Sequence, residues 1–124
     1  MSVEAAPEQK SKFPSVSSKD MKETSPEFAK LTDEVLFGDI WNRPPLTARE
    51  KSIVTVTTLL ALNRVEQLES HFNRALDNGA TKDELNGVIT HVAFYAGWPT
   101  AASGITHLKN VLDARAAKAN SGGK

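Results

Sequence analysis

Residues 47–62 read TAREKSIVTVTTLLAL. Whether this stretch is a helix or a strand decides between an all-helical fold and a mixed fold. Its centre, residues 53–58, is rich in β-branched side chains and has the composition of a strand. Thr47 and Glu50, however, form the capping-box pattern that begins a helix, and residues 59–62 continue it with leucine and alanine. We therefore predict a buried helix, apolar on most sides, of the kind that packs between subunits.

Cap and breaker residues on either side locate the other helices. Ser25-Pro26-Glu27 begins the first helix, which ends before Pro44-Pro45. A third helix carries an apolar stripe and stops at Asn78-Gly79. A second capping box at residues 81–84 opens a fourth helix, and the link is so short that the two helices form a hairpin. A last helix follows Pro99. The predicted fold is all-α, a compact bundle of about five helices around a central helical hairpin.

Composition along the chain predicts one folded domain with loose ends. Residues 1–24 are polar and contain two prolines, so we expect a flexible N-terminal arm there. Residues 116–124 end in Asn-Ser-Gly-Gly-Lys and are expected to be a flexible tail. The helical domain is therefore predicted at residues 25–115.

The charge balance excludes several classes of partner. The chain has 15 Lys and Arg against 15 Asp and Glu, so it lacks the basic surface that nucleic acids or anionic membranes require. The apolar stretch at residues 52–63 is far short of the ~20 residues of a membrane span. No secretory signal is visible at the N-terminus. We expect a cytoplasmic protein with neither a nucleic-acid nor a membrane partner.

The chain contains no cysteine. Disulfides, thiolate metal sites, a cysteine nucleophile and a dithiol redox motif are therefore excluded within it.

Three segments together resemble one family. They are WNRPPLT at 41–47, HFNRALDNGATKDE at 71–84 and HVAFYAGWPTA at 91–101. In combination they are similar to the carboxymuconolactone decarboxylase family, within the alkylhydroperoxidase D-like superfamily, over roughly residues 25–112. The resemblance implies an all-helical fold that assembles as a homo-oligomer, a trimer or a hexamer.

The peroxidase branch of this superfamily uses a Cys-x-x-Cys-x-x-x-His motif with an upstream glutamate. Aligned on His71, that motif puts Arg64 and Gln67 at the two cysteine positions and the glutamate near Ser52, with Glu50 as the closest acid. Peroxide reduction through a disulfide needs an attacking thiolate and a resolving thiol. Thiol peroxidase activity is therefore excluded, and the decarboxylase-like branch remains.

The resemblance then implies a cofactor-free decarboxylation of a small carboxylated lactone, of the type that converts 4-carboxymuconolactone to 3-oxoadipate enol-lactone. Such a site needs cations for the carboxylate that stays, an apolar surface around the one that leaves, and an acid–base group for the incoming proton. Neither a metal nor an organic cofactor is required.

His71 borders the apolar stripe of its helix and is the best candidate for the acid–base group, although a packed core histidine has the same pattern. His91 shares a helix face with Tyr95 and is a second candidate for proton transfer or pocket lining. Glu50 is a candidate catalytic acid, but a helix cap explains it better. The three histidines, counting His107, lack a close ligand pair, so no metal site is predicted.

Arg64 and Gln67 are the candidate anchors for the substrate carboxylate, since guanidinium pairs well with carboxylate. Arg49 is a further candidate anchor, with an ion pair as the alternative. Tyr95 and Trp98 are expected to line the pocket, unless they only pack at the helix end.

Two other functions fit the same residues. A non-catalytic small-molecule-binding or assembly subunit would keep the scaffold without the thiols. An enzyme on another substrate, such as a keto acid lactone or an aldehyde adduct, would keep the histidine.

Overall fold

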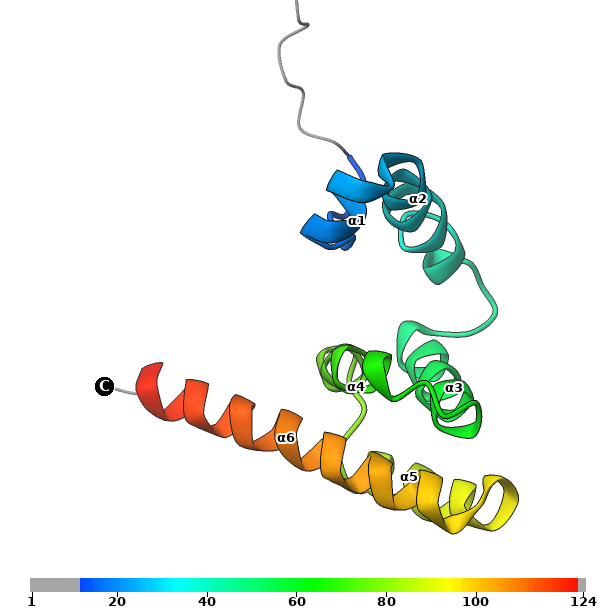
Figure 1. Cartoon of the computed structure of the whole chain (residues 1–124), viewed down its shortest axis with the longest axis vertical. Helices are drawn as coiled ribbons and strands as arrows, with labels where there is room; N and C mark the ends of the chain where they lie inside the picture. The colour runs from blue at the N-terminus through cyan, green and yellow to red at the C-terminus, as the bar shows by residue number, and fades with distance from the viewer. Residues whose placement is uncertain (1–11, 123–124) are drawn as a thin grey trace, which may run out of the picture. The chain divides into compact units, whose positions relative to one another are not determined.

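The computed structural model describes residues 12–122 (Figure 1). The chain divides into two compact units, Met1–Pro45 and Leu46–Lys124. Within the described residues all regular secondary structure is helical, which confirms the predicted all-α class. The boundaries predicted for a single helical domain at 25–115 stay a prediction.

The first unit consists of short helical segments. They are α1 (Lys19–Thr24), α2 (Pro26–Lys30), the π-helical turn η1 (Leu31–Leu36) that continues α2, and the 3-10 turn η2 (Ile40–Asn42). Pro26 occupies the first turn of α2, as predicted.

A carboxylate fixes the chain that precedes these helices. Asp33 accepts hydrogen bonds from the backbone N–H groups of Val16 and Ser17 at 2.8 and 2.7 Å, and from the Ser17 hydroxyl at 2.8 Å. A Cβ on Gly38 would lie 2.7 Å from the Phe13 ring, so only glycine permits this approach. Part of the expected flexible arm is thus helical and packed in the structure, and its residues 1–11 lie outside the described residues.

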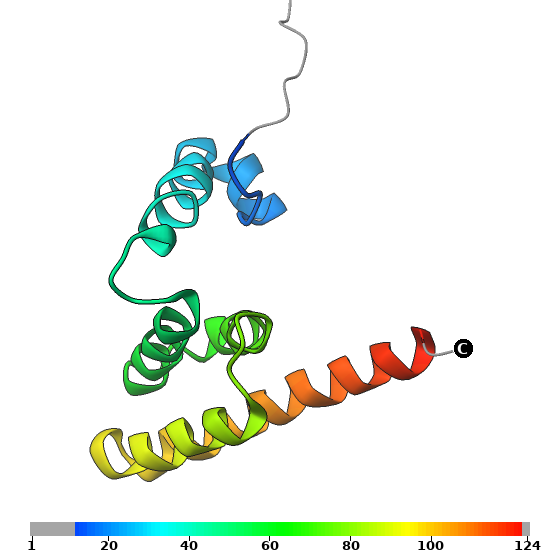
Figure 2. The same cartoon turned by 180° about the vertical axis from the view of Figure 1, so that it is seen from behind.

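The second unit contains four longer helices and one short turn. They are α3 (Ala48–Ala61), the 3-10 turn η3 (Val65–Gln67), α4 (Leu68–Asp77), α5 (Lys82–Ala96) and α6 (Trp98–Gly122). α4 and α5 follow one another across the predicted short link, and each packs against α3 and α6. Figures 1 and 2 both show α5 beside α6, with the C-terminal part of α6 continuing past the beginning of α5.

The hydrophobic core lies where these four helices meet. Its large side chains are almost fully removed from solvent, and each helix supplies at least two of them. They are Val56, Leu60, Leu68, Phe72, Leu85, Ile89, Val92, Leu108 and Val111.

Residues 47–62 form a helix in spite of their β-branched composition. Thr55, Thr57 and Thr58 each donate the side-chain hydroxyl to the carbonyl oxygen four residues earlier, at 2.7 to 2.8 Å. These bonds satisfy the hydroxyls inside the helix without a strand partner. The capping box at Thr47 is present, and so is the one at Thr81 that begins α5. The helix predicted here is therefore confirmed.

The last helix is longer than the sequence pattern predicts. Gly97 ends α5 with φ of +111°, and α6 begins at the next residue. α6 packs closely against α3 at Gly104, where a Cβ would lie 2.6 Å from the Leu60 side chain. α6 then continues to Gly122, through most of the expected flexible tail, because residues 114–119 are mainly alanine, arginine and lysine, which favour helix.

Candidate functional site

The predicted site residues of the second unit fall into three places. His71, Arg64 and Gln67 lie at and before the first half of α4. His91 and Tyr95 lie at the end of α5, beside Trp98 at the start of α6. Arg49 and Glu50 lie at the beginning of α3.

His71 is half-buried on α4, next to the fully buried Phe72. Burial of the ring lowers the pKa of His71, and the positive charge of Arg74, one helical turn later, lowers it further. Burial also lowers the pKa of Arg74, although the Asp77 carboxylate opposes this change. The imidazole is therefore held neutral at pH 7, with a cation close by.

This shift predicts how stability depends on pH. The unfolded chain binds a proton at His71 with an ordinary pKa of about 6.5, and the folded protein binds it more weakly. The stabilisation is complete above pH 6.5 and is lost as pH falls through the lowered pKa of the folded state. Between pH 7.5 and 5.5 we expect wild type to lose stability more steeply than His71→Gln, by at most about 1.4 kcal/mol per pH unit. Urea unfolding of both proteins tests this, and equal slopes would contradict it.

Arg64 and Gln67 lie at the entry to α4. Asn63 turns the chain with φ of +55°, and the Arg64 N–H donates to the Leu59 carbonyl oxygen at 2.8 Å. Both side chains are exposed. Gln67 precedes His71 by four residues, which is about one helical turn, so the two side chains project from the same side of the helix.

His91 and Tyr95 line a hollow of about 270 Å³ between α3 and α5. Their rings lie 5.0 Å apart between centroids, with a tilt of 37°. The other lining residues are Thr57, Ala61, Val92 and Ala96. The Thr57 hydroxyl donates to its own helix, so the imidazole and the phenol supply the polar groups of an otherwise apolar wall. The hollow has the size and chemistry for a small, partly apolar molecule.

Trp98 lies outside the lining of this hollow. Its ring packs edge-on against Phe94, with centroids 6.0 Å apart. Among the described residues, the lining of the hollow also excludes His71, Arg64 and Gln67, so the two predicted histidines do not share one pocket.

The two predicted site residues of α3 have structural partners. Arg49 forms an ion pair with Glu84, which links the first turns of α3 and α5. Glu50 accepts a hydrogen bond from the Thr47 backbone N–H at 2.9 Å, and this bond is the main cause that lowers the pKa of Glu50. A lowered pKa suits a helix cap and not a general acid at neutral pH. Their roles in catalysis and binding stay predictions.

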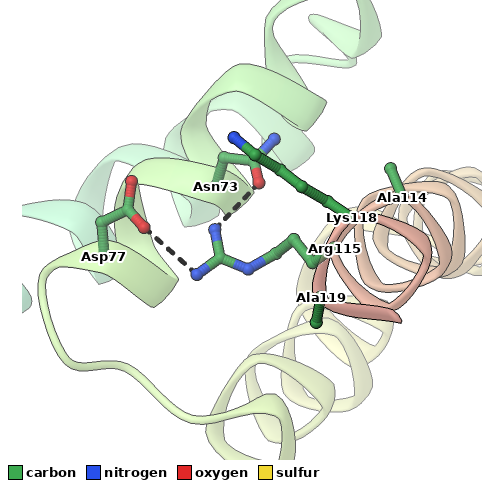
Figure 3. Close-up of a pocket in the computed structure, with 6 residues that line it drawn as sticks. All are labelled: Asn73, Asp77, Ala114, Arg115, Lys118 and Ala119. Carbon is green, nitrogen blue, oxygen red and sulfur yellow. Dashed lines mark hydrogen bonds and ion pairs between the residues drawn. The ribbon is translucent and has the colours of Figure 1, made fainter. Parts of the chain in front are cut away.

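A second hollow, of about 660 Å³, lies between α4 and the far part of α6. Figure 3 shows Arg115 reaching from α6 toward α4, where it donates to Asn73 and Asp77, each at 3.1 Å. Lys118 lines the same hollow. Sequence reasoning missed this place because it expected residues 116–124 to be a loose tail.

Further residues near the predicted site were also missed. Arg74 lies three positions after His71, and that helical spacing could have indicated it. Glu69 accepts from Asn110 at 3.1 Å and lies 2.7 Å from His107 Nδ1, so His107 connects α6 to α4. The Asn78 amide donates to the buried Ser52 hydroxyl at 3.0 Å. These contacts join residues 26 to 41 positions apart, and no local pattern signals them.

Residues 12–122 contain neither a cluster of metal ligands nor a helix that could span a membrane. No three or more His, Asp or Glu side chains gather there in a way that could hold a metal ion. Within the same residues, no helix combines the length and the apolar character needed to cross a membrane.

Comparison with known proteins identifies the family. The sequence profile of the carboxymuconolactone decarboxylase family matches residues 26–109, so the chain belongs to this family. It is 39% identical over 75 residues to the 4-carboxymuconolactone decarboxylase of Acinetobacter baylyi. The matched residues are 60% of this chain and 56% of that protein. It is 30% identical over 70 residues to the nitrosuccinic acid decarboxylase of Metarhizium robertsii, covering 56% of this chain and 49% of that protein. The chain thus spans about half the length of these curated relatives.

Proposed function

We propose that this protein is a cofactor-free decarboxylase that removes one carboxylate from a small carboxylated lactone of the 4-carboxymuconolactone type. The observation that carries the proposal is the similarity to two relatives that are both named as decarboxylases of small acids. Each of those acids has an electron-withdrawing group, the lactone carbonyl in one and the nitro group in the other. The common chemistry therefore needs no cofactor as an electron sink.

The reaction has two parts that the protein must serve. When CO₂ leaves, the electron pair of the broken carbon–carbon bond is delocalised into the lactone carbonyl, and one proton then replaces CO₂ on the carbon framework. A dry, apolar surface favours loss of the charged carboxylate as neutral CO₂. A positioned acid supplies the proton.

We assign the proton donor to His71, supported by its half-buried position on α4 next to the fully buried Phe72. Its lowered pKa leaves a minority of the ring protonated at neutral pH, so this minority form would be the acid and kcat should rise as the pH falls toward that pKa. Arg64 with Gln67 would hold the carboxylate that stays. His91 and Tyr95 would supply an apolar surface, and the hollow that they share has that character, although within one chain it is separate from His71, Arg64 and Gln67. Glu50, Arg49 and Trp98 stay predicted site residues, and their contacts with Thr47, Glu84 and Phe94 support structural roles.

The direct test is turnover. Purified protein is incubated with 4-carboxymuconolactone, and its loss is followed together with CO₂ release. Decarboxylation supports the proposal. Saturable binding of the lactone without CO₂ release would instead support a non-catalytic binding subunit, and the absence of both would overturn the assignment of this substrate class.

Arg64 gives a sharper prediction within the same assay. A charge-assisted hydrogen bond to a carboxylate contributes about 1.5–3 kcal/mol, so Arg64→Ala should raise KM roughly 10- to 100-fold, with a much smaller change in kcat. Arg43→Ala is the matched control, because Arg43 already pairs with Asp39 through two hydrogen bonds at 2.8 Å. An equal effect of the two substitutions would remove Arg64 from the proposed site.

We further propose that the protein functions as a homo-oligomer, a trimer or a hexamer, as the family resemblance implies.

A further inference from the structure

One long stretch of the second unit carries no charge. Residues 85–108 contain no Asp, Glu, Lys or Arg, although such residues make up 24% of the chain. This stretch includes most of α5 and the first half of α6, which pack against each other.

Large apolar side chains of this stretch are exposed. Phe94 is 74% exposed, Tyr95 is 83% exposed and Trp98 is 68% exposed. Ile105, seven residues after Trp98 and so on the same side of α6, is 55% exposed. We call these four side chains the aromatic face.

The aromatic face is ordered by contacts of its own. Phe94 and Trp98 pack edge to face, with centroids 6.0 Å apart, and Tyr95 leans on His91 at 5.0 Å. Side chains that are already fixed lose less conformational entropy when a partner covers them. Exposed aromatic side chains without charged neighbours are typical of the centre of a protein interface.

We propose that the aromatic face is the contact surface for a second copy of this chain. The proposal rests on the self-association proposed above and is independent of the decarboxylase chemistry. An uncharged surface that meets its own copy buries no unpaired charge and brings no like charges together.

The available area agrees with this partner. An aromatic side chain buries about 150–250 Å², so at the observed exposures the three rings present roughly 350–550 Å². Burying the same patch on two copies gives roughly 700–1,100 Å² before Ile105 and its neighbours are counted, close to the roughly 1,000 Å² that a specific interface needs.

The contact would also complete the apolar hollow. Tyr95 belongs both to the aromatic face and to the lining beside His91. A second copy seated on the face would therefore cover one edge of the hollow and exclude water from it. Phe94 and Trp98 do not line the hollow, which allows the contact to be disrupted without altering that lining.

The test is the mass of the particle in solution. We expect wild type to be an oligomer in analytical ultracentrifugation, and Phe94→Asp to reduce the mass at least two-fold at the same concentration. Phe28→Asp is the matched control, because Phe28 on α2 is an exposed aromatic residue, 54% exposed, outside both the uncharged stretch and the helix expected to pack between subunits. It should leave the mass unchanged. Circular dichroism confirms that both variants are helical.

A second measurement avoids charged substitutions, which could unfold the protein. Because the chain has no cysteine, Thr90→Cys introduces one thiol, one turn before Phe94 on α5. Its alkylation rate should rise several-fold on dilution, whereas the rate for Asp113→Cys on α6 should not change. A monomeric wild type, a mass unaffected by Phe94→Asp, or an alkylation rate at position 90 that is independent of concentration would each overturn the proposal. Binding of a monomer to phosphatidylcholine vesicles would assign the face to lipid instead.

Discussion

Phe72→Ala is expected to lower the free energy of unfolding by about 3–5 kcal/mol. The Phe72 ring is completely buried among core side chains from the four helices of the second unit. Its removal loses the transfer free energy of the ring and leaves a cavity that the neighbouring helices fill only in part. Because a domain of this size has a total stability of only about 5–15 kcal/mol, this substitution removes a large share of it.

Urea denaturation followed by circular dichroism measures the change. Phe28→Ala is the matched control, because the Phe28 ring on α2 is 54% exposed and its removal creates no cavity. We expect the control to cost less than about 1 kcal/mol. Comparable losses for the two variants would mean that Phe72 does not lie at the centre of the core.

His71→Ala is expected to reduce kcat for 4-carboxymuconolactone at least 100-fold, if His71 supplies the proton that replaces CO₂. General acid catalysis by a positioned side chain contributes about 10²- to 10⁴-fold, and alanine has no proton to donate. The reduction should be in kcat and not in KM, because the proton is transferred in the transition state.

His107→Ala is the matched histidine control. His107 lies beside Glu69 on the contact between α4 and α6, so its loss should change kcat less than about three-fold and should affect stability instead. A wild type that decarboxylates the lactone, together with a His71→Ala variant of nearly full activity, would place the proton donor elsewhere. His91 would then be the next residue to replace.

The helices could be predicted because their signals are local. The two capping boxes begin at Thr47 and Thr81, and each involves residues only three positions apart. The threonine hydroxyls of α3 bond within the same helix, so the β-branched composition of residues 53–58 costs little. Such patterns indicate where a helix begins and which side is apolar, and the structure contains both helices.

The structure of residues 12–24 and 116–122 was not predicted in the same way. Residues 12–24 are polar, and they are held by Asp33 and by the close approach of Phe13 to Gly38. Residues 116–122 were expected to be loose, but they extend α6 beyond the Arg115 contact with α4. The first outcome depends on a partner at least 16 positions away, which composition does not reveal. The second follows from the helix-favouring residues 114–119, a local signal that the Ser-Gly-Gly ending outweighed in the prediction.

The candidate site was only partly accessible to sequence reasoning. The spacing of His91 and Tyr95 predicts a shared helix face, but the hollow also needs Thr57 and Ala61 from α3. Arg49 has the chemistry of a carboxylate anchor, but its guanidinium already pairs with the carboxylate of Glu84. Glu84 lies 35 positions further along the chain, so no local pattern indicates this pair. Helix packing determines which polar groups meet, and that packing is not encoded in any short motif.

The missing side chain at Gly104 sets the spacing between α6 and α3. A Cβ there would lie 2.6 Å from the side chain of Leu60, which is itself buried in the core. A methyl group at position 104 would therefore force the Leu60 side chain or the α6 backbone to move, and either movement would disturb the packing of the core. The depth of this core is fixed as much by an atom that is absent as by the side chains that fill it.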